Sequence, residues 1–75
     1  MPGNKELEDL IEIITIAIAK EKASIELYTK AYHKATKESA RKVFALLVEQ
    51  EKLHVKNLRS QLDDINSELK LERRK

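Results

Sequence analysis

The sequence predicts an all-α fold, a long antiparallel helical hairpin that dimerises into a four-helix bundle. Apolar residues recur with the helical period along most of the 75 residues, and this periodicity changes phase once, near residue 36. Two helices of this length bury little apolar surface by themselves, so self-association is the expected source of stability. The whole chain, residues 1–75, is therefore expected to form one half of a bundle.

The first helix is expected to run from about residue 5 to about residue 35. Asn4 is a suitable N-cap, and Glu6 and Glu8 would lie in the first turns, where the helix dipole favours acidic side chains. A set of apolar residues falls within about 40° of Glu21 on the helical wheel. These residues are Leu7, Leu10, Ile14, Ala17, Ile25, Tyr28, Tyr32 and Ala35.

The second helix is expected from about residue 37 to about residue 70, with Thr36 as its cap. One continuous helix of about 65 residues is the alternative. The hairpin is favoured because the two apolar stripes do not keep one heptad register across residue 36. Residues 73–75, Arg-Arg-Lys, are expected to fray.

Composition narrows the classes of function. The chain has no cysteine, which removes disulfides and thiolate metal sites and agrees with a reducing, cytoplasmic setting. Its 15 basic and 13 acidic residues leave a net charge of +2, without the basic excess typical of proteins that bind nucleic acids. The N-terminus does not resemble a signal peptide, and the apolar run at residues 13–19 is too short to span a bilayer, so no membrane partner is expected.

Glu21, Glu51 and His54 are the candidate metal ligands. Glu51 and His54 are three residues apart and therefore share a helix face, and each glutamate lies in the middle of an apolar stripe, where an unpaired carboxylate is costly. The two glutamates are each about 15 residues from Thr36, so an antiparallel hairpin brings them to the same level.

A symmetric pair of hairpins would supply four glutamates and two histidines. One Glu from each of two helices, with Glu-x-x-His from each of the other two, is the ligand set of di-iron carboxylate bundles. Four carboxylates balance two divalent cations, and oxygen ligands with one imidazole per metal suit iron or manganese, although zinc can also bind such sites.

These residues resemble the ferritin-like superfamily, in particular the rubrerythrin-type helical domain. The chain has one hairpin where a full rubrerythrin-type bundle has two, and in this respect it is similar to encapsulated ferritins, which complete the di-iron site across a dimer interface. The stretches that carry the resemblance are residues 17–21, Tyr28, Phe44, Leu47, residues 49–54 and Leu58.

The resemblance implies Glu21, Glu51 and His54 as iron ligands, with the Tyr28 hydroxyl near the carboxylates. It implies a ferroxidase or peroxidase-type oxidoreductase that uses O2 or H2O2 in iron handling or in defence against oxidative stress. Lys20 and Ala23 replace the further acids that encapsulated ferritins usually carry. These 75 residues hold no paired cysteines of the kind found in the rubredoxin module of rubrerythrins, so the resemblance implies an external electron donor for peroxidase turnover.

The remaining residues of interest have simpler interpretations. His33 and Glu49 are expected in solvent, and Tyr32 and Phe44 in the core. Three apolar residues fall on the outer faces, where they are either scattered exposure or contacts between dimers in a higher oligomer. These are Ile16, Leu46 and Leu53.

Two alternatives remain. The chain could be a non-enzymatic hairpin dimer that binds RNA or a protein, which would favour a basic stripe on one face. It could also be a truncated half of a longer rubrerythrin-like protein, in which case dimerisation would follow from the truncation.

Overall fold

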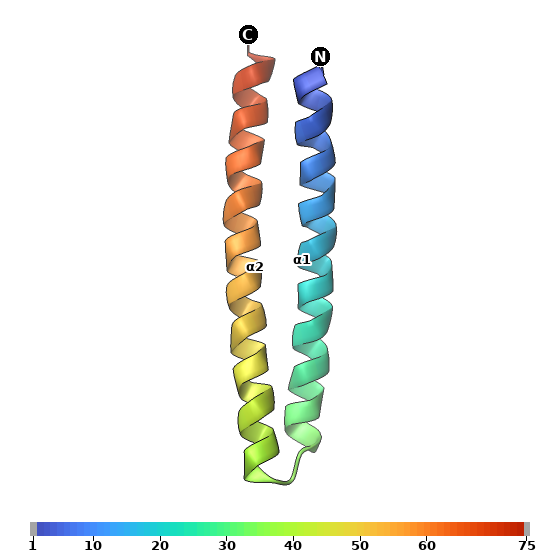
Figure 1. Ribbon diagram of the computed structural model, residues 1–75, viewed down its shortest axis with the longest axis vertical. Helices are drawn as coiled ribbons and strands as arrows, with labels where there is room; N and C mark the ends of the chain where they lie inside the picture. Colours follow the sequence, from blue (N-terminus) through green and yellow to red (C-terminus); the bar gives the residue numbers. More distant parts are fainter. Residues whose placement is uncertain (1, 75) are drawn as a thin grey trace.

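The protein folds as two antiparallel α-helices joined by a short turn, as the apolar pattern predicts (Figure 1). The computed structural model describes residues 2–74, with side chains described from residue 5 onward. Helix α1 spans Pro2–Lys34 and helix α2 spans Glu38–Arg73. The described residues form a rod of 58 × 14 × 11 Å, with the two chain ends side by side at one end and the turn at the other.

The predicted start of the first helix was wrong by three residues. Helix α1 begins at Pro2, so Asn4 lies within the helix and is not its N-cap, and the first turn holds no acidic residue. Proline is favoured at the first helical position, because its fixed φ suits the helix and its missing N–H would have had no partner there.

The predicted cap of the second helix was also wrong. The N-cap is Lys37 rather than Thr36; its backbone is extended, with φ −85° and ψ 134°, and its side chain makes no capping hydrogen bond. The backbone N–H of Arg41 donates a hydrogen bond of 3.0 Å to the Lys37 carbonyl, and this bond is the first of the helix. No described residue has a positive φ, so residues 35–37 make the turn without glycine.

The two ends of the rod are held by side chains from both helices. Near the turn, the Arg41 guanidinium of α2 lies 4.5 Å from the centre of the Tyr32 ring of α1. At the other end, Arg73 donates a hydrogen bond of 2.8 Å to Glu8. This pair explains why α2 continues to Arg73, three residues past its expected end.

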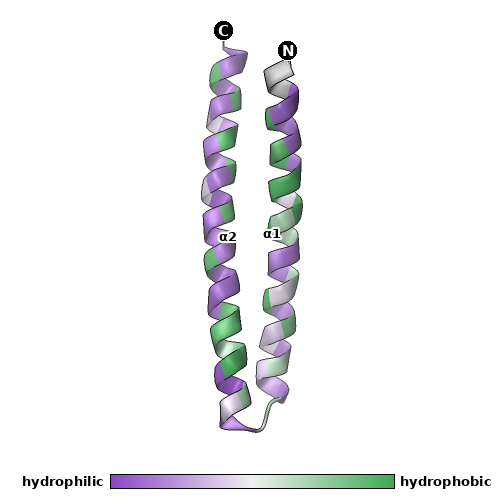
Figure 2. Ribbon diagram, viewed as in Figure 1, coloured by the Kyte–Doolittle hydropathy of each residue, from purple (hydrophilic) through white to green (hydrophobic). Residues whose placement is uncertain are grey.

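The core is a thin seam between the helices. Its buried residues are Leu7, Ile18, Val55 and Leu69, and none of the described large side chains is fully buried. Hydrophobic segments occur along the length of both helices (Figure 2). Much of this surface remains exposed, including Ile13 with 61% and Val43 with 55% of its surface accessible. A two-helix layer therefore leaves a large share of its apolar residues without a partner.

Within the described residues, neither helix contains an apolar stretch sufficient to cross a membrane.

Candidate metal centre

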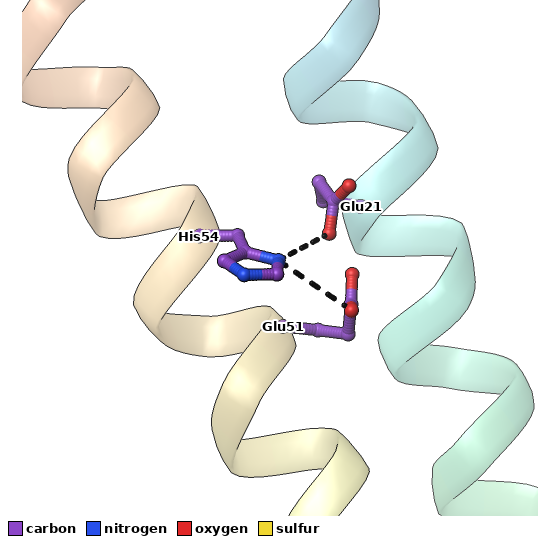
Figure 3. Close-up of side chains that lie close together, drawn as sticks. All are labelled: Glu21, Glu51 and His54. Atoms are coloured by element: carbon purple, nitrogen blue, oxygen red, sulfur yellow. Dashed lines mark ion pairs between the residues drawn. The ribbon is translucent and has the colours of Figure 1, made fainter.

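Three side chains meet midway along the hairpin. Glu21 projects from α1 and Glu51 and His54 project from α2, so the site joins the two helices (Figure 3). One ligand atom from each residue lies within 4.8 Å of the other two, and the described residues contain no other such group of three. The antiparallel fold thus brings Glu21 and Glu51 to one level, as their equal separation from the turn predicts.

The imidazole of His54 faces both carboxylates. Its Nδ1 lies 3.4 Å from Oε2 of Glu21 and 3.5 Å from Oε1 of Glu51 (Figure 3). A charge-assisted hydrogen bond between such groups is about 2.7–2.9 Å long, so both contacts are longer than a direct bond. The three ligand atoms therefore face a common point but do not form short hydrogen bonds with one another.

Burial increases the cost of this arrangement. Oε2 of Glu21 is a buried oxygen without a hydrogen-bond partner. The Glu21 and Glu51 side chains are 28% and 17% exposed, whereas His54 is 57% exposed. An unpaired buried carboxylate oxygen costs roughly 1–3 kcal/mol or more. A cation between the three donors would remove this penalty, so the residues present fit a metal ion.

The donor set also limits which metal fits. Two carboxylates and one neutral imidazole nitrogen are ligands that iron, manganese and zinc accept, whereas no thiolate is present. Three ligands from one chain do not fill the coordination sphere of iron or manganese. The accessible His54 ring shows that the hairpin leaves one side of the site open.

The glutamates are less central than their helical stripes suggest. Both were expected in the middle of the buried faces, but both are only half-buried. The seam passes to one side of them, because Ile18 and Val55 lie about 60° and 40° from Glu21 and Glu51 on the helical wheel. The ligands therefore lie at the margin of the helix contact, facing the open side.

Tyr28 is half-buried on α1, and no hydrogen bond joins its hydroxyl to Glu21, Glu51 or His54. Its suggested place beside the carboxylates therefore stays a prediction. Among the described residues of a single hairpin, no further histidine or acidic residue joins this group. The sequence therefore holds no fourth ligand that the spacing argument overlooked within one hairpin.

The other predicted residues lie as follows. His33 and Glu49 are exposed, and Glu49 lies 3.7 Å from Lys52. Tyr32 and Phe44 are half-buried rather than fully in a core. The three outer apolar residues are exposed: Ile16, Leu46 and Leu53.

Comparison with known proteins gives one finding. The model of the rubrerythrin family matches residues 4–75, nearly the whole chain. No curated protein and no solved structure shows a significant match to it.

Proposed function

Because the chain belongs to the rubrerythrin family, we propose that it is a di-iron carboxylate protein whose centre oxidises ferrous iron. In this proposal Glu21, Glu51 and His54 of two chains together hold two iron ions. The observation that carries it is the buried, unpartnered oxygen of Glu21, which faces an imidazole and a second carboxylate at one level of the hairpin.

Charge supports a paired site. Two copies of the centre contain four carboxylates, whose four negative charges equal the positive charge of two divalent cations. Without metal, the same four carboxylates would repel one another in a largely apolar bundle. A metal site shared by two chains would account for the open side of the site on a single hairpin. It would also account for the limited burial within that hairpin.

Each residue has a defined task in this proposal. Glu21 and Glu51 would hold the ions through their carboxylates, and His54 would bind through Nδ1, which faces both carboxylates. In a dimer, apolar residues of the second hairpin would cover the open side of the centre and restrict water there. When bound, two ferrous ions would each give up one electron, and these two electrons with two protons would reduce O2 to H2O2, or H2O2 to two water molecules. The 75 residues contain no cysteine, so electrons that return iron to the ferrous state would come from outside them.

Anaerobic ferrous titration followed by oxygen tests this proposal. We expect saturation at about one iron per chain, then the absorbance of oxidised iron once oxygen is admitted. Glu21→Gln and His54→Ala should abolish paired binding while the helical circular dichroism remains. His33→Ala is the matched control, because this exposed histidine lies away from the site.

The proposal fails if wild-type chains do not saturate near one iron per chain. It also fails if the His54 and His33 variants bind iron equally well.

A further inference from the structure

The basic side chains in the middle of helix α2 all lie on one side of it. Residues 41–59 contain five basic residues, which fall within an arc of about 100° on the helical wheel. Measured from the buried Val55, this arc extends from about 40° to about 140° in the direction opposite to His54. Four of the five side chains are exposed and one is half-buried. They form a stripe about 27 Å long on the helix. The five residues are Arg41, Lys42, Lys52, Lys56 and Arg59.

Helix α1 places further basic residues on the same side of the hairpin. Lys22, Lys30 and His33 lie about 40–120° from the buried Ile18, in the direction away from Glu21. Because the helices are antiparallel, the same sense of rotation on each leads to the same side. We call this side, formed by the α2 stripe and these three residues of α1, the back face. The metal ligands lie across the seam from it.

Charge is concentrated on the back face. Residues 22–33 and 41–59 contain seven basic and three acidic residues, and all of these except Glu51 lie on this face. The acidic residues that do lie there are Glu26 and Glu49, which leaves a net charge of +5 with His33 neutral. A surface of this kind attracts anions.

Contacts within the chain cancel little of this charge. Among the described residues, Lys52 is the one cation of the α2 stripe within ion-pair distance of an acidic side chain, that of Glu49 at 3.7 Å. The Arg41 guanidinium lies over the Tyr32 ring, a contact that leaves its positive charge in place. Most of the stripe is therefore available to an external anion.

The back face also contains a hollow of about 310 Å³. Its walls include Tyr32 and His33 of α1 and Val48, Glu49 and Lys52 of α2. The two rings meet edge to face, with their centres 5.5 Å apart. Aromatic rings beside a row of cations are the two components of sites for single-stranded nucleic acid, because bases stack on the rings and phosphates pair with the cations.

The total charge of the chain had predicted no nucleic-acid partner, because +2 lacks the usual basic excess. That total includes residues 6–12 and 60–66, which contain six acidic residues and no basic one. These segments lie beyond the metal centre, away from the turn. The potential at the back face depends on the charges nearest to it, so the low total does not describe this surface.

We propose that the back face binds a single strand of nucleic acid, with phosphates along the α2 stripe and a base in the hollow beside His33. A single strand fits better than a duplex, because its unpaired bases can enter the hollow. An acidic protein would pair with the cations but would leave the aromatic hollow without a role. The proposal does not rest on the proposed function, since a second hairpin at the open side of the metal centre leaves the back face exposed.

Salt dependence measures the phosphate contacts. The probe is a fluorescein-labelled oligothymidylate about 16 nucleotides long, whose anisotropy gives the affinity. For about four or five neutralised phosphates, the logarithm of the association constant should fall with that of the salt concentration, with a slope of about −3. Lys56→Gln should weaken binding roughly threefold and make the slope shallower by about 0.7. Lys20→Gln is the matched control, because Lys20 is exposed and lies about 160° from Ile18, outside the back face.

His33→Ala tests the hollow. It should weaken binding roughly fivefold without changing the slope with salt, because it removes a stacking surface and no phosphate contact. Ser39→Ala, at an exposed position outside the back face, should leave the affinity unchanged. An unchanged affinity of His33→Ala would overturn the place of the base in the hollow.

The remaining outcomes identify the partner and separate the two proposals. A slope near zero, or equal affinities of Lys56→Gln and Lys20→Gln, would overturn binding along the stripe. A duplex of the same length that binds as tightly would overturn the choice of a single strand, and equal competition by polyglutamate would assign the face to an acidic protein instead. None of these results would change iron binding at one per chain. Loss of iron binding by the wild-type chain would overturn the proposed function alone.

Discussion

Replacing Glu21 with methionine should make the chain more stable than wild type without metal and less stable than wild type with metal. Methionine has a similar length, contains no charge and suits irregular apolar sites. Leaving a buried polar group unpaired costs roughly 1–3 kcal/mol. Because the Glu21 side chain is 28% exposed and lies 3.4 Å from Nδ1 of His54, the lower end applies. Without metal, Glu21→Met should therefore be about 1 kcal/mol more stable, equivalent to about 4–8 °C in a domain of this size.

With metal, the order should invert. A ligand at 100 times its Kd stabilises the form that binds it by about 2.7 kcal/mol, and Glu21→Met loses a ligand on which this gain depends. Thermal unfolding followed by circular dichroism, at one chain concentration, with chelator and with zinc, measures both effects. Glu49→Met is the control, because the Glu49 side chain is 72% exposed and should change neither value.

A Glu21→Met variant that is no more stable than wild type in chelator would rule out a cost of the unpaired carboxylate. Equal stabilisation of the variant and the wild type by zinc would rule out Glu21 as a metal ligand.

Three further predictions concern other parts of the hairpin. Leu69→Ala should destabilise the chain by about 2 kcal/mol in chemical denaturation, because Leu69 is buried, whereas Leu71→Ala at an exposed position should change it little. The hydrogen bond and charge of Asp9 raise the pKa of Lys5 above its ordinary 10.5, so Asp9→Asn should lower that pKa in an NMR titration. Because the folded-state pKa is raised, this pair's stabilisation is complete below the unfolded-state pKa and is lost as pH rises through the folded-state pKa. Tyr28→Phe should leave the iron stoichiometry unchanged, since it removes no ligand, and a slower oxidation rate by stopped-flow absorbance would place its hydroxyl in the reaction.

The hairpin was predictable because its signal is long and repetitive. Apolar residues at helical spacing over two segments, with a change of phase between them, leave few alternatives. The helix ends were harder to predict, because they depend on single contacts. Arg73 was expected to fray, yet it lies in the helix and bonds to Glu8. Because Glu8 is 65 residues away in sequence, no local pattern around Arg73 indicates this contact.

The proximity of the three candidate ligands was predictable, but their depth of burial was not. Spacing alone identified Glu21, Glu51 and His54 as neighbours, and the structure brings them together. A helical stripe does not reveal which part of it the neighbouring helix covers, so both glutamates were expected deeper than they lie. With one partner helix, the contact settles on Ile18 and Val55, and the ligands remain at its margin.

A metal centre that is open on one side of each hairpin would make the number of complete sites depend on the concentration of the protein. If each chain carries three ligands and two chains make a site, the number of complete sites at low expression grows with the square of the chain concentration. A scarce protein would then hold almost no redox-active iron, and a tenfold rise in expression would yield about a hundredfold more working centres. Under the proposed function, the exposed ring of His54 would make iron oxidation a property of paired chains, so that activity would depend on the concentration of the protein itself.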